Sequence, residues 1–463
     1  MNSNLDLAIN YALENYQSFI DDLTSLIKIK TVSANSEHTE ACENGARWIA
    51  NYLNSLGSED TRILATQKHP VVFGKISSSE RNRPTILVYG HYDVQPADPL
   101  DLWTSDPYTA TIKDHLLFAR GSSDMKGQMI VVLAALKSII NTSSLPLNIK
   151  FLFEGDEEIG SPGIKDFLFK NKDLFKCDFV LNLDAGMIAP EKPTIVYGLR
   201  GLAYFEINLT GPAQDLHSGM FGGVVYNPIQ ALSELIAGMK DSEGVIQLPG
   251  FYDDVIQLAN EEKKELEKLG MDEQFYKEQT GVSKLFGEKG YSPIERIGAR
   301  PTLDVNGIFG GYIGEGPKTV IPSKAMAKIS MRLVPNQTPK KVNEQMIQYM
   351  ERNVPEQIKW DMKMLSSDPA SLTEIGFPAT KCFAESIEKV WGVPPVYQRG
   401  GGSIPIVSHM QEILGAESVL SGFSLPEDNI HSPNERLNLE VFKKGIETII
   451  NFIFNVGENC EII

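Results

Sequence analysis

The sequence has little of what membrane, secreted and nucleic-acid-binding proteins need. It has no run of about 18 apolar residues that could span a bilayer, and its start lacks a positively charged segment followed by an apolar run, as a secretory signal requires. Its 43 basic residues are outnumbered by 60 acidic ones, and the net charge of -17 would repel nucleic acid and anionic membranes. We therefore expect a cytoplasmic protein whose partners are small molecules, with no nucleic acid and no membrane among them.

Cysteine is also scarce. The four residues Cys42, Cys177, Cys382 and Cys460 are widely separated and form no CxxC pair of the kind that metal and redox sites use. We expect four isolated, reduced thiols, as is usual for a cytoplasmic protein.

The chain is long enough to form more than one hydrophobic core. Its 463 residues exceed the length at which a single core stops growing, and 42% hydrophobic with 22% charged residues are ordinary values for a globular protein. We predict one domain from residues 1–197 and 370–463, interrupted by a second domain at residues 198–369.

The two outer segments have the pattern of an α/β domain. Short apolar runs rich in β-branched and aromatic residues predict buried strands at residues 71–76, 85–89, 147–153 and 179–183. Helical spacing of apolar residues predicts helices at residues 5–28 and 128–140, and another near 383–390. Alternating strands and helices are typical of an α/β fold.

The middle of the chain has a different pattern. Residues 203–209 and 324–333 alternate in polarity, as half-exposed antiparallel strands do. Asn227-Pro228 and Thr338-Pro339 each place a capping side chain before a proline at the first helical position, so each strand is followed by a predicted helix. The pattern predicts a small α+β domain, with residues 260–298 as a charged helical excursion or surface insertion.

Acidic residues and histidines follow the predicted strands, where an open α/β sheet presents its ligand-binding groups. Each taken singly has an alternative interpretation as a hydrogen-bonded loop residue, or, for Asp124, as a helix cap. Glu157 and Glu158 are adjacent in a hydrophobic context, and their mutual repulsion calls for a cation. The set of two imidazoles and three carboxylates that could share a site is His91, Asp124, Glu158, Asp184 and His431.

The residue types in this set suit a site for two metal ions. Mixed nitrogen and oxygen ligands suit zinc, manganese or cobalt, and one shared carboxylate lets two ions sit about 3.5–4 Å apart with a water between them. Amide hydrolysis also needs a base that accepts the proton of that water and returns it to the leaving nitrogen. Glu157, which remains outside the ligand set, fits this role.

The motifs around these residues resemble those of the co-catalytic metallopeptidases that include carnosinase, cytosolic nonspecific dipeptidase, carboxypeptidase G, acetylornithine deacetylase and succinyl-diaminopimelate desuccinylase. The resemblance spans nearly the whole chain and is closest to the carnosinase and nonspecific dipeptidase branch, although residues 366–378 lack a histidine that this branch has in its lid. The matching motifs are GHYDVQP (90–96), ARGSSDMKGQ (119–128), EGDEEIGSPG (154–163), NLDAG (182–186), DLHSGMFGG (215–223), KTVIPSKA (318–325), RLVPNQTP (332–339), GGGSIP (400–405) and His431.

The resemblance implies a zinc-exopeptidase-like catalytic domain with a central mixed sheet, plus an inserted α+β lid and dimerisation domain. It implies two divalent ions per subunit, zinc first and manganese or cobalt as alternatives. Asp124 would bridge the ions, with a cis peptide after it. His91 and Asp184 would complete the ligand set of one ion, and Glu158 and His431 would complete that of the other.

The resemblance also implies roles in catalysis and substrate binding. Glu157 would be the general base, Asp93 would brace His91, and His217 would reach from the partner subunit of a homodimer to the substrate carbonyl. The residues expected to bind substrate, with Arg332 holding its carboxylate, are Arg332, Thr319, Gly401, Gly402 and Ser403.

Three functional hypotheses follow. The first is a metallo-dipeptidase that cuts the amide bond of a dipeptide or a similar small carboxylate-bearing substrate. The second is a deacylase of N-acyl amino acids, of the succinyl-diaminopimelate desuccinylase or acetylornithine deacetylase type, which would share every catalytic residue. The third is a metal-binding or amino-acid-binding protein without catalysis, for which we would expect a lost ligand or base.

Overall fold

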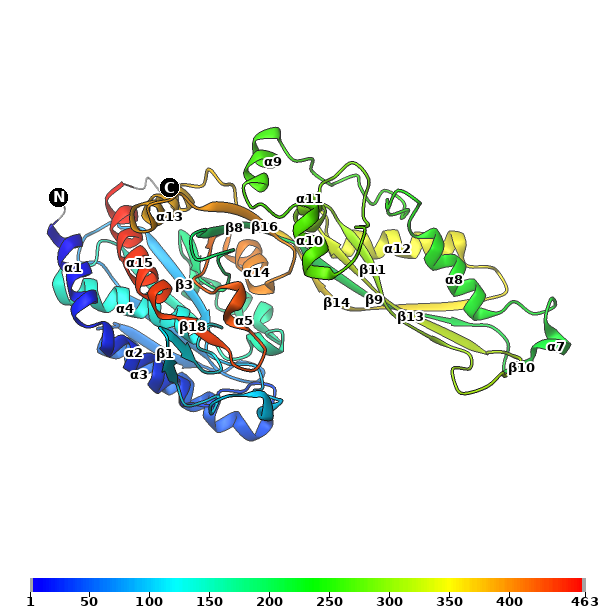
Figure 1. Ribbon diagram of the computed structural model, residues 1–463, viewed down its shortest axis with the longest axis horizontal. Helices are drawn as coiled ribbons and strands as arrows, with labels where there is room; N and C mark the ends of the chain where they lie inside the picture. The colour runs from blue at the N-terminus through cyan, green and yellow to red at the C-terminus, as the bar shows by residue number, and fades with distance from the viewer. Residues whose placement is uncertain (1–2, 460–463) are drawn as a thin grey trace. The chain divides into compact units, whose positions relative to one another are not determined.

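The chain forms two compact units in a computed structural model that describes residues 3–459 (Figure 1). The first unit comprises Met1–Tyr197, Thr373–Gln398 and His409–Ile463, and the second comprises Gly198–Leu372 and Arg399–Ser408. The segment 399–408 therefore groups with the second unit. Among the described residues, no helix combines the length and the apolar character needed to cross a membrane.

A mixed sheet forms the centre of the first unit. β3 pairs in parallel with both β6 and β7, and β7 pairs in parallel with β17, whereas β1, β2 and β8 are antiparallel to their neighbours. Four strands therefore end at the same edge of the sheet. In spatial order the strands are β1 (Asp60–Leu64), β2 (Val71–Ile76), β6 (Asn148–Glu154), β3 (Thr85–His91), β7 (Phe179–Asn182), β17 (Glu417–Leu420) and β8 (Thr194–Leu199).

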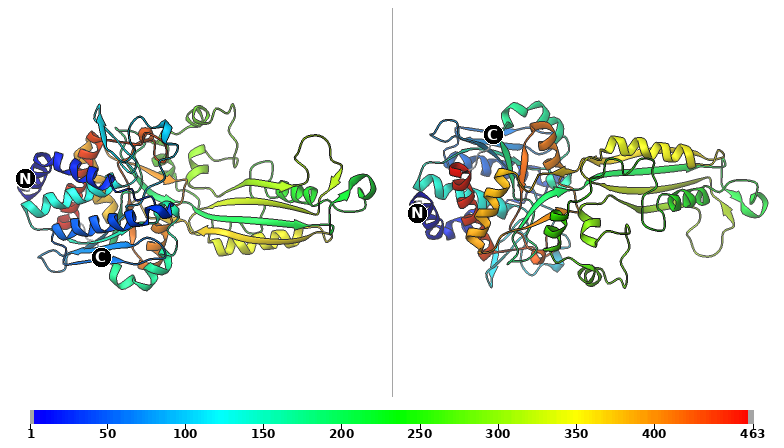
Figure 2. Two further views of the ribbon diagram at one scale, coloured as in Figure 1. Left: turned by 90° about the horizontal axis from the view of Figure 1, so that it is seen from below. Right: turned by 90° about the horizontal axis from the view of Figure 1, so that it is seen from above.

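Helices cover both faces of this sheet (Figures 1 and 2). Successive strand residues point to opposite faces. Val72 joins the core cluster formed with the long helices, whereas the ring of Phe73 packs edge-on against Phe175 of α6 on the other face. The helices of this unit are α1 (Ser3–Glu14), α2 (Tyr16–Ile27), α3 (Thr39–Ser55), α4 (Lys126–Thr142), α5 (Ile164–Lys170), α6 (Lys172–Phe175), α13 (Pro378–Trp391) and α15 (Leu439–Asn459). Helix α14 (Pro405–Leu414) has residues in both units.

The prediction of one helix at residues 5–28 is wrong. Two helices, α1 and α2, fill this range and are separated at Asn15. The side-chain amide of Asn15 donates to the Tyr11 carbonyl at 2.9 Å, and its backbone (φ -103°, ψ 11°) leaves the helical region. The Tyr11 carbonyl also accepts the backbone N–H of Asn15 at 3.0 Å, so both donors of Asn15 meet at the carbonyl that closes the last turn of α1.

The prediction of four reduced thiols is wrong at Cys382, which is disulfide-bonded. Cys42 and Cys177 are free, and Cys460 lies outside the described residues. Spacing along the chain does not report which side chains the fold brings together, so wide separation could not exclude a bond.

An antiparallel four-stranded sheet forms the second unit. Along β9 (Gly201–Thr210) buried and half-buried residues alternate. Ala203, Phe205, Ile207 and Leu209 are buried in a core shared with α8 (Pro228–Gly238) and α12 (Pro339–Asn353). The predicted caps are confirmed, because Asn227 accepts the backbone N–H of Ile229 and Thr338 accepts that of Lys341. In spatial order the strands are β11 (Thr302–Gly310), β13 (Lys324–Leu333), β9 (Gly201–Thr210) and β14 (Lys359–Asp368).

Smaller elements complete both units. The charged segment 260–298, predicted as a helical excursion or surface insertion, contains three short helices. In the second unit these elements are α7 (Ser218–Phe221), α8 (Pro228–Gly238), α9 (Asn260–Glu267), α10 (Glu273–Thr280), α11 (Pro293–Gly298), α12 (Pro339–Asn353), β10 (Leu216–His217), β12 (Val320–Ile321) and β15 (Ser371–Leu372), while β16 spans Val396–Gly400. In the first unit β4 (Thr111–Lys113), β5 (Leu116–Phe118) and β18 (Arg436–Asn438) form a small separate sheet, and the 3-10 turns are η1 (Ser36–His38), η2 (Leu100–Leu102), η3 (Glu157–Ile159) and η4 (Pro426–Asp428).

Helix α4 is buried along nearly its whole length. We therefore expect the free energy of unfolding to depend strongly on the packing of this helix. Leu136 on α4 is fully buried, so Leu136→Ala should lower the free energy of unfolding by about 2–5 kcal/mol through lost burial and a residual cavity. Leu100, which is 59% exposed, provides a control, and Leu100→Ala should change little. Urea denaturation followed by circular dichroism measures both; equal midpoints for the two variants would contradict the packing described here.

Candidate metal centre

The predicted site residues of the first unit lie at the edge of the sheet where the parallel strands end. His91 is the last residue of β3, and Asp184 follows β7. Glu157 and Glu158 begin the turn η3 after β6. The other two come from loops: Asp124 precedes α4, and His431 lies between η4 and β18.

The structure brings these residues together in two groups of three. In the first, His91 Nε2 is 3.1 Å from Asp124 Oδ1 and 3.6 Å from Asp184 Oδ1. In the second, His431 Nε2 is 2.9 Å from Asp124 Oδ2 and 3.1 Å from Glu158 Oε2. Within each group the potential ligand atoms all lie within 4.8 Å of one another. Asp124 belongs to both groups and turns one carboxylate oxygen toward each.

The donor set of each group fits a divalent cation. One imidazole nitrogen and two carboxylates form a mixed nitrogen and oxygen environment, which suits zinc, manganese or cobalt better than the all-oxygen environment that magnesium and calcium prefer. A carboxylate shared between two such groups is the arrangement that holds two cations close together.

Asp93 and Gln95 support the two groups from behind. The buried Asp93 carboxylate lies 3.5 Å from His91 Nδ1 and accepts the backbone N–H groups of Glu157, at 3.2 Å, and Glu158, at 3.0 Å. The side-chain amide of Gln95 donates to Glu158 Oε2 at 2.9 Å. Asp93 thus orients the histidine and the acidic turn at once, while Gln95 fixes the Glu158 carboxylate.

The electrostatics of the site favour positive charge. Burial lowers the pKa of His91, yet the adjacent Asp184 and Asp124 carboxylates outweigh it and hold that pKa well above the ordinary value. Hydrogen bonds with Asp124 and Glu158 raise the pKa of His431 to about 10. Burial, with help from Asp184 and Glu158, raises the pKa of Glu157 to about 8. Cations bound among these carboxylates would relieve the same excess of negative charge.

Glu157 differs from its neighbours in its contacts. Among the described residues its carboxylate has no hydrogen-bond partner, whereas the carboxylate of the adjacent Glu158 contacts both Gln95 and His431. The side chain is half-buried and close enough to His91 and Asp184 to interact with both electrostatically. It therefore has free lone pairs beside the two groups.

The predicted site residues of the second unit form two sets within that unit. His217 ends β10 and pairs with β12, and the Ser218 N–H donates to the Thr319 carbonyl at 3.0 Å. The exposed His217 ring accepts the Gly219 N–H on Nδ1 at 3.0 Å. When the ring is neutral, its proton therefore lies on Nε2.

Arg332 and the glycine-rich loop form the second of these sets. The Arg332 guanidinium donates to Ser403 Oγ at 3.0 Å, and that hydroxyl donates to the Arg200 carbonyl at 2.6 Å. The Arg200 side chain donates from Nε to the Gly401 carbonyl at 2.9 Å. The backbone N–H of Arg200 donates to the Gly402 carbonyl at 3.2 Å. Arg200 thus braces the loop beside Arg332.

Sequence reasoning did not assign a role to several residues that the site uses. Gln95 lies inside the GHYDVQP motif, two residues after Asp93. This position could have indicated its role beside the metal ligands. Nothing in the local pattern distinguishes Arg200 from an ordinary charged loop residue. Its contacts with Gly401 and Gly402 depend on a segment that is distant in the sequence.

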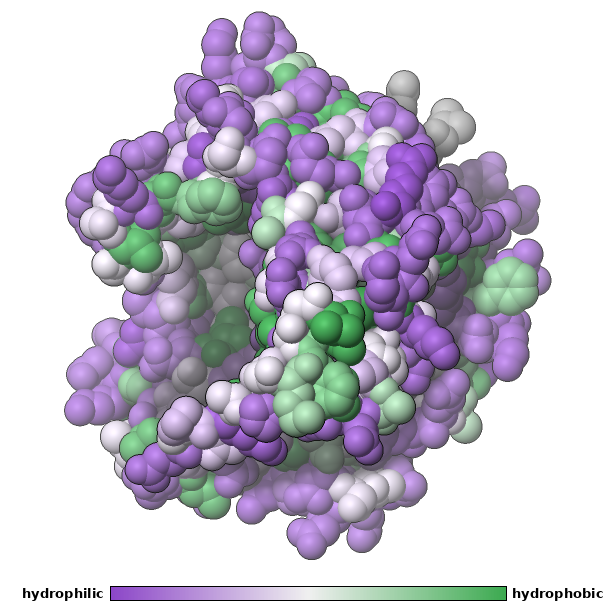
Figure 3. Space-filling model, turned by 90° about the vertical axis from the view of Figure 1, so that its right-hand side faces the viewer, coloured by the Kyte–Doolittle hydropathy of each residue, from purple (hydrophilic) through white to green (hydrophobic). Residues whose placement is uncertain are grey.

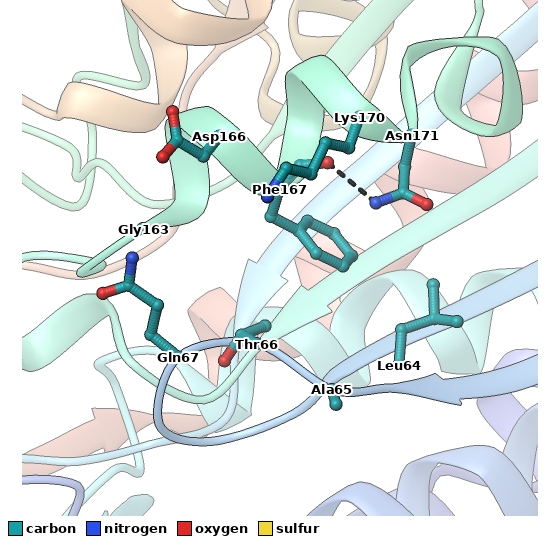
Figure 4. Close-up of a pocket in the computed structure, with 9 residues that line it drawn as sticks. All are labelled: Leu64, Ala65, Thr66, Gln67, Gly163, Asp166, Phe167, Lys170 and Asn171. Carbon is teal, nitrogen blue, oxygen red and sulfur yellow. Dashed lines mark hydrogen bonds between the residues drawn. The ribbon is translucent and has the colours of Figure 1, made fainter.

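A separate pocket of about 380 Å³ lies between the loop after β1 and helix α5 (Figure 4). Phe167 and Asn171 line one wall, where the Asn171 amide donates to the Phe167 carbonyl, and Gln67 lies over Gly163. None of the residues of the two groups lines this pocket. It is therefore distinct from the candidate metal centre.

Known proteins are similar to this chain in both sequence and fold. The family model described as Peptidase family M20/M25/M40 matches residues 87–455. The chain belongs to this peptidase family. The human protein named Beta-Ala-His dipeptidase is 33% identical over 398 residues, covering 84% of this chain and 78% of the relative. A relative from Candida albicans named Cys-Gly metallodipeptidase DUG1 is 31% identical over 466 residues, covering 95% of each chain.

A solved structure supports the same assignment. The M20 family metallo-carboxypeptidase Sso-CP2 of Sulfolobus solfataricus is 32% identical, with a TM-score of 0.81 over 95% of this chain and 99% of that one. The predicted family, its dipeptidase branch, the fold class and the class of enzyme, a peptidase among the hydrolases, are confirmed. The peptide bond between Asp124 and Met125 is cis, as the resemblance implied.

The sharing of Asp124 leads to a prediction about metal stoichiometry. The wild-type protein, stripped of metal, should bind two equivalents of Zn²⁺ or Mn²⁺ per chain. His431→Ala should retain one tight equivalent, whereas Asp124→Ala should lose both, because each group depends on one of its oxygens. Calorimetric titration with elemental analysis measures this.

His115, a histidine on the surface, is the matched control, and His115→Ala should bind as the wild type does. Two tight equivalents in Asp124→Ala would show that the two groups do not share this carboxylate.

Proposed function

We propose that this protein is a metal-dependent dipeptidase that hydrolyses the peptide bond of dipeptides or similar small carboxylate-bearing substrates. The observation that carries the proposal is the pair of three-residue groups that share Asp124 beside the free carboxylate of Glu157. The names of the human and Candida albicans relatives describe dipeptidases, which supports the same substrate class.

Two divalent cations per chain are proposed as cofactors, with zinc as the resident ion and manganese or cobalt as alternatives, in keeping with the donor set. His91, Asp124 and Asp184 would hold one, and Asp124, Glu158 and His431 the other. When bound, such a pair supplies Lewis-acid activation of water and of a substrate carbonyl. A cytoplasmic location remains a proposal from the sequence.

The remaining chemistry belongs to the side chains. Glu157 accepts the proton of the attacking water and transfers it to the leaving amine nitrogen, which completes the cleavage with no net change in its own protonation. Asp93 holds the Glu157 backbone through its N–H and also orients His91, so the base and a ligand share one support. The turn η3 thereby places the base next to the ligand Glu158.

The second unit is proposed to bind the substrate. The planar Arg332 guanidinium, steadied by Ser403, suits two-pronged recognition of a carboxylate. His217, with its proton on Nε2, can donate to an oxyanion, and Thr319, which directly precedes the adjacent strand β12, would assist it. The backbone at Gly401 and Gly402 permits close approach of a ligand because it carries no side chains.

We also propose that the protein is a homodimer in which His217 acts on the substrate of the partner subunit. Large apolar side chains are exposed near His217 in the second unit, with Met220 at 73% and Val224 at 81% exposure. Apolar side chains exposed together are typical of protein interfaces. Figure 3, which views the side where Figure 1 draws α7 and β10, shows hydrophobic residues interrupting a mostly hydrophilic surface.

The base assignment predicts a specific variant. Glu157→Gln should bind both cations as the wild type does but lower kcat by about 10²–10⁴-fold, since a general base typically contributes that much. Glu261→Gln on the exposed face of α9 should leave kcat unchanged. Metal titration and steady-state kinetics measure the two properties separately. Wild-type kcat in Glu157→Gln would remove Glu157 from the mechanism.

The proposed activity is tested by a comparative assay after removal of metal. Dialysis against a chelator should abolish hydrolysis, and Zn²⁺, Mn²⁺ or Co²⁺ should restore it. The restored enzyme should cleave dipeptides with a higher kcat/KM than N-acetylornithine or N-succinyl-diaminopimelate. Preference for either acylated substrate would establish a deacylase instead, and full activity without metal would overturn the metal-dependent mechanism.

A further inference from the structure

A carboxylate from the far end of the chain holds the loop that carries Asp124. Glu435 is completely buried, and its two oxygens accept three backbone N–H groups of this loop. Oε2 accepts the N–H of Gly121 at 2.8 Å, and Oε1 accepts those of Ser123 at 2.9 Å and Asp124 at 3.1 Å. These segments are 311 residues apart in the sequence at Asp124, so the contact is a product of the tertiary fold.

The charge of Glu435 is balanced locally. Arg120, which is 1% exposed, donates from Nη1 to Glu435 Oε2 at 2.8 Å, and its guanidinium lies 5.5 Å from the centre of the Trp103 ring. A buried carboxylate is tolerated when it is paired and fully hydrogen-bonded, and both conditions hold here. Among the described residues, the donors to the Glu435 side chain all belong to the segment 120–124, which ends at Asp124.

Further contacts join the same two segments. The Ser123 hydroxyl donates to Asp428 Oδ2 at 2.8 Å, and the Ala119 N–H donates to the Glu435 carbonyl at 3.0 Å. His431 lies on the stretch between these two acceptors. The contacts thus connect the backbone segment that carries Asp124 with the segment that carries His431. In the second group, His431 Nε2 lies 2.9 Å from Asp124 Oδ2.

We propose that Glu435 is a positioning residue of the metal centre, which fixes the backbone at residues 121–124 so that Asp124 faces both groups before any cation binds. This inference rests on the proposed function, in which Asp124 bridges two cations. Met125, the N-cap residue of the helix α4 that follows, makes no side-chain capping hydrogen bond. The acceptors for the backbone N–H groups of Gly121, Ser123 and Asp124 come from Glu435.

The proposal predicts a loss of metal affinity. Glu435→Gln replaces one acceptor oxygen with an NH₂ group, which would face an N–H group or the Arg120 guanidinium and leave donors opposed to donors. The metal-free variant should bind Zn²⁺ or Mn²⁺ about 10–100-fold more weakly, the usual loss when a residue that orients a metal ligand is changed. Calorimetric titration of the metal-free protein measures this without reference to activity.

Glu288→Gln is the matched control. Glu288 also accepts hydrogen bonds from an arginine with which it forms a largely buried pair, Arg300, and both residues belong to the second unit. It should destabilise the protein in thermal unfolding yet keep the wild-type metal affinity. If folded Glu435→Gln binds metal as the wild type does, or if Glu288→Gln loses as much affinity, the positioning role is wrong.

Two further measurements keep the proposal testable if Glu435→Gln does not fold. Glu435→Asp retains the charge opposite Arg120 but is one methylene shorter, so it should fold and still weaken metal binding. In the metal-free wild type, amide hydrogen exchange should be slow for the peptide containing Gly121, Ser123 and Asp124. Exchange there as fast as in exposed loops would overturn the proposal. A wild-type protein that binds no divalent cation would instead overturn the proposed function itself.

Discussion

One carboxylate serving two groups of ligands is the constraint on which the site depends. Asp124 directs Oδ1 toward His91 and Oδ2 toward His431, at 3.1 Å and 2.9 Å. Neither group is complete without it, since each consists of one imidazole, one carboxylate of its own and the shared Asp124. Any movement of this side chain would disturb both groups at once, and the surrounding structure is built to prevent such movement.

The fold concentrates negative charge in one place and then holds it there. Parallel strands end at a common edge, so the residues that follow β3, β6 and β7 meet whatever their separation in the sequence. Repulsion among the carboxylates is opposed by rigid supports. Asp93 fixes His91 and the acidic turn, Gln95 fixes Glu158, and Glu435 fixes the loop before Asp124. In the proposed function two cations offset this concentration of negative charge.

Much of this arrangement could be predicted from the sequence, because its signals are local. Strands β2 and β13 coincide with the predicted ranges 71–76 and 324–333, since apolar runs and alternating polarity report burial directly. The candidate ligands could be named because each lies just after such a strand or in a recognisable motif. Long-range contacts leave no local signal, which is why the contacts of Glu435 were not foreseen. The break at Asn15 was missed for a different reason, as the apolar spacing continues across it.

The central claim, that two cations share Asp124, is tested most directly by anomalous X-ray scattering from crystals of the zinc-loaded protein at the metal absorption edge. The account predicts two peaks on either side of the Asp124 carboxylate, one adjoining His91 and Asp184 and the other adjoining Glu158 and His431. A single peak, or peaks away from these side chains, would contradict it.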